Sequence, residues 1–190
     1  MTQAQNAVSS APLLKEGDTC RGFTVATVVP LPYIKGVYYA LEHTETGARY
    51  IHVQSPDKEN AFGVALKTVP ADATGVAHIL EHTVLCGSRK FPVRDPFFSM
   101  LKRSLSSFMN AFTASDWTLY PFATQNRKDF YNLLDVYLDA VFYPRLEHLS
   151  FKQEGHRLEV EDNDGGERRL VYKGVVYNEM KGAMSSPDQI

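Results

Sequence analysis

The sequence is poor in several features that mark particular classes of protein. Only two cysteines, Cys20 and Cys86, occur among 190 residues, which is too few for a disulfide framework and typical of a reducing compartment. Neither sign of charge dominates, since 20 Lys and Arg oppose 22 Asp and Glu for a net charge of −2. This balance argues against nucleic acid and anionic membranes as partners. No apolar run approaches the roughly 20 residues needed to cross a bilayer.

Targeting signals are also missing from the amino-terminal residues 1–20. No Lys or Arg precedes Lys15, and no apolar stretch there is long enough for the core of a secretion signal. A transit peptide would be expected to carry arginines in this segment. We therefore expect a cytoplasmic protein, with an organelle matrix as the alternative. We expect residues 1–20 to be a mobile lead-in and residues 21–190 to form one domain.

The chain does contain enough apolar residues, 44% of the total, to bury a substantial core. Strand-like and helical patterns alternate irregularly along it. Alternating and β-branched residues predict strands within 23–31, 36–54, 61–70, 106–125 and 156–162. The second and the fourth of these ranges should each form a hairpin. Helical spacing predicts helices within 75–86, 97–104, 127–143 and 146–155. We expect an α+β fold, a largely antiparallel sheet with helices packed on it.

Local signals predict where three of these helices begin. Thr74 is a candidate N-cap for the first, and Asp95-Pro96 combines a capping side chain with a proline suited to a first turn. Asn126 is the candidate N-cap of the longest helix, which Pro144 should end. The segment 170–184 is ambiguous, because its start favours a strand and its end a helix.

The stretch HILEH, His78 to His82, carries the most specific chemistry in the sequence. On a helix, residues at i, i+3 and i+4 share a face, so His78, Glu81 and His82 should project together. Val76, Ile79, Leu80 and Val84 should face the other side and anchor the helix in the core. Two histidines four residues apart can supply adjacent ligands of a tetrahedral zinc ion, with Glu81 as a general base beside it.

Two interpretations of HILEH remain open at this point. One is a zinc site; the other is a half-buried helix whose histidines are satisfied by backbone carbonyls. Catalytic zinc takes a third protein ligand and leaves a position for water, and a carboxylate is the expected third ligand. The residues alone do not distinguish Glu154, Glu159 and Glu179 for that role.

Three blocks of the sequence resemble the pitrilysin family of zinc metallopeptidases, the inverzincins, and within it the presequence protease branch. They are GVAHILEHTVLCGSRKFPVRDPFFSMLKRSL, SSFMNAFTASDWTLYPFATQN and YKGVVYNEMKGAMSSPD, in that order. The resemblance is dense from about Gly75 to the end. It implies a pitrilysin-type metallopeptidase domain that hydrolyses unfolded oligopeptides with a zinc ion.

The resemblance also assigns residues to roles. It implies that His78, His82 and Glu179 bind zinc, and that Glu81 activates the attacking water. It implies a helix around Glu179, which resolves the ambiguous last segment. The stretch FMNAF matches the cleft strand that pairs with an extended substrate, so Asn110, Ala111 and Phe112 are the substrate-binding candidates.

Family members of this branch are long chains whose two halves enclose the substrate. The sequence stops just after Glu179, so we expect an amino-terminal fragment that needs a carboxyl-terminal half as partner and is weakly active or inactive alone. One alternative is a noncatalytic pitrilysin-like binding subunit, although all four expected residues are present. A purely structural zinc site explains an open three-ligand arrangement beside a glutamate poorly.

Overall fold

The computed structural model describes residues 13–94, 96–162 and 167–185. Contacts divide the chain into two compact units, Met1–Lys58 and Glu59–Ile190, whereas the sequence analysis placed its boundary at residue 20. Most of the expected lead-in lies outside the described residues, and its last two residues form strand β1 (Thr19–Cys20). Among the described helices, none is both long and apolar enough to span a bilayer.

The first unit is an antiparallel sheet. It consists of β1, β2 (Phe23–Leu31), β3 (Gly36–His43) and β4 (Arg49–Gln54) in that order, with a short 3-10 helix at Pro32–Ile34. The expected turn between β3 and β4 contains Gly47 at a φ of 68°, a left-handed conformation that glycine adopts without steric cost. The hydrophobic core of this unit contains Val25, Val37, Tyr39 and Leu41.

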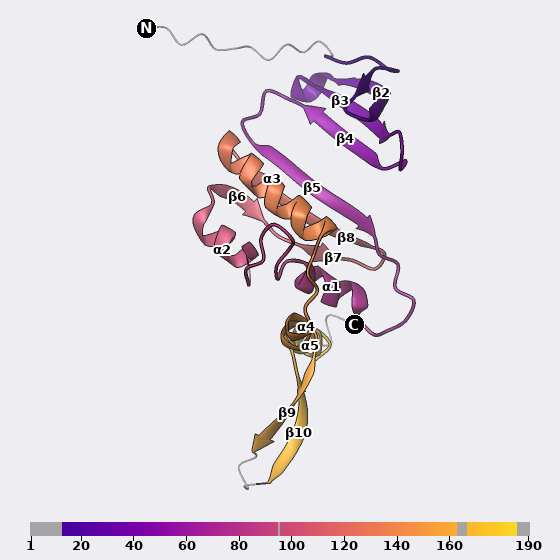
Figure 1. Cartoon of the computed structure of the whole chain (residues 1–190). Helices are drawn as coiled ribbons and strands as arrows, with labels where there is room; N and C mark the ends of the chain where they lie inside the picture. The colour runs from indigo at the N-terminus through magenta and orange to yellow at the C-terminus, as the bar shows by residue number, and fades with distance from the viewer. Residues whose placement is uncertain (1–12, 95, 163–166, 186–190) are drawn as a thin grey trace. The chain divides into compact units, whose positions relative to one another are not determined.

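The second unit contains a separate antiparallel sheet that supports the candidate site. Its strands β5 (Asn60–Lys67), β8 (Trp117–Thr124) and β6 (Ser106–Met109) lie in that order, and the short β7 (Phe112–Thr113) also pairs with β8. Helix α3 (Arg127–Phe142) packs against this sheet (Figure 1). Residues from the sheet, from α3 and from the end of α1 form the core of the unit: Val84, Met109, Tyr120, Phe122, Leu133 and Tyr137.

The predicted start of α3 is confirmed. The side chain of Asn126 accepts hydrogen bonds from the backbone N–H groups of Lys128 and Asp129, at 3.0 and 3.1 Å. Helix α2 (Pro96–Arg103) begins at the proline expected in its first turn. The capping role expected of Asp95 lies outside the described residues.

The prediction that Thr74 caps the helix containing HILEH is wrong. Helix α1 (Val76–Val84) has Gly75 as its N-cap, in the left-handed region at a φ of 73°, and no side chain caps it. The hydroxyl of Thr74 donates instead to the carboxylate of Asp72. A local hydrogen bond in the preceding turn thus takes the side chain that the cap would need.

The predicted apolar face of α1 is only partly correct. Val84 is buried in the core, but Val76 and Leu80 are exposed. Val76, Ile79 and Leu80 line an apolar pocket of about 220 Å³ together with Phe151 of α4 (His148–Glu154). The helix is therefore anchored at its carboxyl end, where the core of the sheet begins.

The carboxyl-terminal part of the second unit is a hairpin between two helices. Strands β9 (Arg157–Asp162) and β10 (Arg168–Lys173) pair with each other and extend away from α4 and α5 (Figure 1). Helix α5 (Val175–Ala183) follows, so the ambiguous last segment is a strand and then a helix. The α+β class is confirmed, with antiparallel strands distributed over three sheets.

Candidate metal centre

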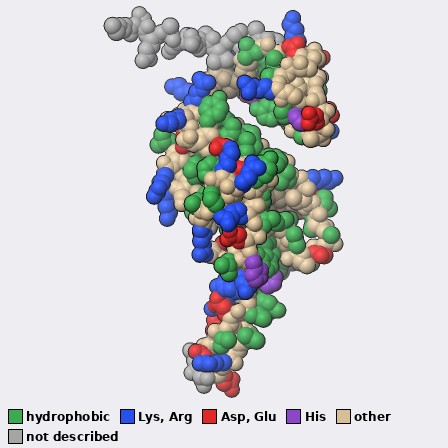
Figure 2. All heavy atoms as spheres, in the orientation of Figure 1, with side chains coloured by type: hydrophobic (Ala, Val, Ile, Leu, Met, Phe, Trp, Pro, Cys, Tyr) green, Lys and Arg blue, Asp and Glu red, His purple; other side chains and the backbone are tan. Residues whose placement is uncertain are grey.

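Helix α1 presents His78 and His82 on one face, as their spacing predicts. The two ring centroids lie 5.1 Å apart, and the side chains retain 27% and 22% of their exposure. Histidine side chains are visible at the molecular surface in the region where Figure 1 places α1, α4 and α5 (Figure 2). The rings are thus packed enough to be oriented and open enough to receive a ligand.

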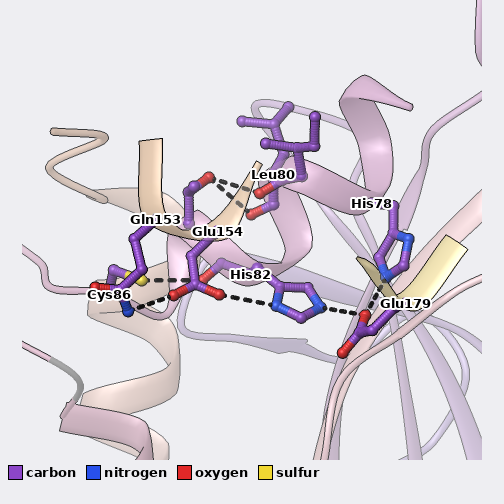
Figure 3. A network of polar contacts seen from close by, with 9 residues as sticks. His78, Leu80, His82, Cys86, Gln153, Glu154 and Glu179 are labelled. Carbon is purple, nitrogen blue, oxygen red and sulfur yellow. Dashed lines mark hydrogen bonds and ion pairs between the residues drawn. The ribbon is translucent and has the colours of Figure 1, made fainter. Parts of the chain in front are cut away.

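Helix α5 brings the carboxylate of Glu179 to this face of α1 (Figure 3). Its Oε2 atom lies 3.5 Å from Nε2 of His78 and 3.5 Å from Nε2 of His82. Ligand atoms of these three residues all lie within 4.8 Å of one another. The structure therefore brings together the three residues for which the sequence analysis predicted zinc binding.

Two glycines allow α4 and α5 to approach this closely. A Cβ atom added to Gly174 would overlap the carbonyl oxygen of Gly155 and lie 2.9 Å from the Cα atom of His156. Gly174 is the N-cap of α5, and Gly155 follows the last residue of α4. The absence of a side chain at Gly174 therefore sets the position from which α5 extends Glu179 toward α1.

The distances fit a tetrahedral metal ion. Zinc bonds to imidazole nitrogen and carboxylate oxygen are about 2.0–2.2 Å long, so a tetrahedral centre holds two such atoms about 3.4 Å apart. Both nitrogen–oxygen distances to Glu179 are 3.5 Å. Two histidines and one carboxylate are also a donor set found in catalytic zinc sites.

Glu81 lies between the two histidines in sequence but outside the group formed by His78, His82 and Glu179. Its side chain is buried, with 8% of the residue exposed. Burial, together with the charge of the Glu81 carboxylate, raises the pKa of Tyr120 in β8. Glu81 is thus held at the interface between α1 and the sheet, one residue before His82 in the sequence.

Glu154, at the end of α4, contacts the site and was not selected from the sequence. Its Oε2 lies 3.2 Å from Nδ1 of His82, and its Oε1 accepts a hydrogen bond from Nε2 of Gln153 at 2.8 Å (Figure 3). The thiol of Cys86 donates to the backbone carbonyl of His82 at 3.4 Å. No spacing rule links His82 to a residue 72 positions away. The residues alone therefore did not distinguish Glu154 from Glu159 and Glu179 as the third metal ligand.

The substrate-binding candidates lie in and just before β7, a strand that packs near α1. FMNAF does not form the continuous strand expected: β6 ends at Met109 and β7 begins at Phe112. Between them, Oδ1 of Asn110 accepts a hydrogen bond from the backbone N–H of Ala111 at 2.9 Å. This local bond interrupts the strand, while β7 still packs near α1. The binding roles of Asn110, Ala111 and Phe112 stay predictions.

Comparison with known proteins identifies relatives of this arrangement. The family model described as insulinase (peptidase family M16) matches residues 69–183, more than half of the chain. The crystal structure of pitrilysin resembles the fold with a TM-score of 0.51 and 26% identity, covering 59% of this chain and 12% of that one.

Closer sequence relatives are two mitochondrial presequence proteases. The protein from Xenopus laevis is 55% identical over 186 residues, and that from Mus musculus is 55% identical over 188 residues. These matches cover 98% and 99% of this chain but only 18% of each relative. The resemblance seen in the motifs is confirmed, and the chain belongs to the insulinase family of peptidases, family M16.

Proposed function

We propose that this chain carries the metal centre of a zinc-dependent endopeptidase. The observation that supports the proposal is the convergence of His78, His82 and Glu179 within 4.8 Å, in a chain that belongs to a peptidase family. His78 and His82 would bind zinc through Nε2, and Glu179 through Oε2. A bound zinc ion would lower the pKa of its water to about 7 and polarise the scissile carbonyl.

In this proposal Glu81 is the general base. It lies one residue before His82 and is largely shielded from solvent, and in this proposal its carboxylate accepts the proton of the attacking water. It would then pass that proton to the amine of the leaving peptide, as a base acting in hydrolysis must. Glu179 has no part in proton transfer here, because its role is to complete the ligand set.

We further propose that unfolded oligopeptides are the substrates and that they bind in extended form along β6. Support comes from the sheet order β5-β8-β6, in which β6 pairs with β8 on one side and with no other described strand. An edge strand can bind a peptide through its main chain, which gives affinity without requiring one sequence. Asn110, Ala111 and Phe112 would contact the peptide next to the metal.

The chain spans about a fifth of the length of the relatives it matches. We therefore propose that efficient turnover needs further protein that corresponds to the rest of those relatives, including a carboxyl-terminal half. The relatives are described as mitochondrial, which favours an organelle matrix over the cytoplasm that the amino-terminal composition suggested. Fractionation of cells that express the tagged protein would test the location.

The deciding experiment substitutes Glu81→Gln in the full-length protein and measures bound zinc and peptide hydrolysis together. We expect the variant to retain zinc, because Glu81 is not among the three grouped residues, and to lose nearly all hydrolysis. Retention of full activity with bound zinc would refute the role of Glu81.

A noncatalytic binding subunit is the rival interpretation. It predicts that the wild-type protein binds peptides but never cleaves them, whether or not metal is present. Hydrolysis that disappears with a chelator and returns with zinc would exclude this rival.

A further inference from the structure

Strands β9 and β10 form a two-stranded antiparallel hairpin that, among the described residues, pairs with no third strand. The register places Leu158 opposite Tyr172 and Val160 opposite Leu170. Because side chains alternate between the two faces of a strand, these four side chains lie on the same face. The four residues make up the apolar hairpin face.

The apolar hairpin face is open to solvent. Its four residues are 54–67% exposed, and Figure 2 shows hydrophobic side chains at the surface of the hairpin that extends away from α4 and α5 in Figure 1. Antiparallel sheets normally turn their apolar side chains toward a core, and a lone two-stranded hairpin is at best marginally stable in water. A stable hairpin therefore requires that another part of the folded protein cover this face.

The opposite face of the hairpin is satisfied without a partner. Arg169 and Lys173 pair with Glu161 at 3.1 and 3.4 Å. At the far end of the apolar hairpin face, Arg168 pairs with Asp162 at 3.3 Å. Charges that are neutralised within the hairpin need no external partner. The side of the hairpin that does need one is apolar with a polar rim, which is the composition of an interaction surface.

The size of the apolar hairpin face indicates what covers it. Four side chains of this size, exposed to this degree, offer roughly 400 Å², whereas a stable interface between separate proteins buries about 800 Å² on each partner. The face is therefore too small to hold a second molecule by itself. A segment of the same polypeptide needs less area, because its attachment gives it a high effective concentration. The matched relatives are long enough to supply such a segment, since the matches cover only 18% of each.

We propose that the apolar hairpin face binds an apolar segment of the same polypeptide, from the part of the full-length protein that corresponds to the unmatched four-fifths of the relatives. The inference rests on the proposed function and deepens it, because it assigns one contact to the further protein that efficient turnover needs. The segment would present aliphatic or aromatic side chains and no unpaired charge, since an unpaired charge buried against this face would cost free energy.

Binding at the apolar hairpin face would also affect the metal centre. Strand β10 ends at Lys173 and α5 begins at Val175, so the hairpin leads directly into the helix that carries Glu179. The rings of Tyr172 and Tyr177 lie 5.8 Å apart across this junction. A segment bound to the hairpin would therefore restrain α5 and, with it, the carboxylate of Glu179.

Photo-crosslinking in the full-length protein tests the contact. A benzophenone amino acid replaces Leu170 or, as the matched control, Arg169 on the opposite face; Leu170 is 67% exposed and the Arg169 side chain 66%. Peptide mapping after irradiation should show severalfold more cross-links from position 170, joining it to a segment outside residues 1–190 of the same molecule. Cross-links between two molecules or to residues 1–58, or no excess over the control, would overturn the inference.

Hydrogen exchange of the full-length protein gives a second measurement that introduces no bulky side chain. The double variant Val160→Thr, Leu170→Thr keeps residues that suit a strand but weakens the apolar contact. The amides of β9 and β10 should then exchange at least about tenfold faster than in the wild type. Arg169→Thr is the control and should change the exchange less, because a surface ion pair contributes little. Equal exchange in the wild type and the double variant would contradict the inference.

Neither measurement involves zinc or a peptide. A wild-type protein that binds no zinc and cleaves no peptide would refute the proposed function, and the cross-links and exchange rates would still decide whether the apolar hairpin face is covered.

Discussion

Nε2 of His82 lies 3.5 Å from Oε2 of Glu179, although the two residues belong to helices at opposite ends of the second unit's sequence. The same oxygen lies at the same distance from His78. One carboxylate oxygen thus lies opposite two imidazole nitrogens. A cation bound between them would satisfy all three atoms.

Replacement of Glu179 by glutamine should remove one of three metal ligands. We expect zinc affinity to fall by more than about 100-fold, beyond the range for residues that only support a ligand. The measurement is a competition titration followed by metal analysis of the purified protein. Glu147→Gln is the matched control, since the side chains of Glu147 and Glu179 are 51% and 50% exposed. Equal zinc affinity in both variants would remove Glu179 from the ligand set.

Alanine at Gly174 should displace α5, because the added Cβ would overlap the carbonyl oxygen of Gly155. We expect a loss of about 1–3 kcal/mol in the free energy of unfolding, as for other overpacked sites, and weaker zinc binding since Glu179 moves with α5. Gly182→Ala is the control on the same helix, where the new Cβ meets no atom within 4 Å.

Gly182→Ala should leave zinc affinity unchanged and stabilise the helix by about 0.5–1 kcal/mol, because alanine restricts the unfolded chain. Both free energies come from urea unfolding, and both affinities from chelator competition. If the two alanine variants behaved alike, the close approach of Gly174 to Gly155 would not position the metal ligand.

Loss of the Asn126 side chain should weaken the amino end of α3. Asn126→Ala leaves the N–H groups of Lys128 and Asp129 without the acceptor they have now. The expected cost is about 1 kcal/mol in the free energy of unfolding. Asn126→Ser should restore most of this stability, because serine can accept the same bonds. A serine variant no more stable than the alanine variant would contradict the capping role.

Acid should destabilise the fold partly through Asp139, which is 4% exposed in α3. Burial by itself raises the pKa of this carboxyl, but the interactions with the Lys90 N–H and the Ser88 side chain and the charges of Arg89 and Lys90 together outweigh it. The pKa of Asp139 is therefore below its ordinary value of 3.8. The resulting stabilisation is present above that ordinary value and is lost as pH falls through the lowered native pKa.

Urea unfolding at pH 7 and at pH 3 checks whether this stabilisation is lost as the pH falls. Asp139→Asn should cost stability at pH 7 and cost less at pH 3, where protonation of the wild type begins to remove the same charge. Asp135→Asn is the control on the same helix, because Asp135 pairs with Lys90 at the surface, where it is 53% exposed. It should have the smaller effect at pH 7, and a cost for Asp139→Asn that does not change with pH would refute the linkage.

Elements with strong local signals agree with the sequence analysis. Helix α3 follows its Asn126 cap and stops just before Pro144, because capping and proline geometry act over a few residues. The prediction that Thr74 caps α1 is wrong for an equally local reason, because the Thr74 hydroxyl donates to the carboxylate of Asp72 instead. The break in FMNAF at Asn110 has the same origin, because the asparagine side chain accepts from the next backbone N–H. Competition among neighbouring polar groups is not visible in the pattern of apolar residues.

The spacing within HILEH by itself determined that His78 and His82 share a face of one helix, because helical geometry relates residues four apart without help from the rest of the chain. Glu179 was identified only through the resemblance of its motif. Only the tertiary structure decided that Glu154 lies behind His82 and that Glu179 lies in front of it. Both contacts depend on how α4 and α5 pack at Gly155 and Gly174, and packing between distant segments leaves no periodic signal in a sequence.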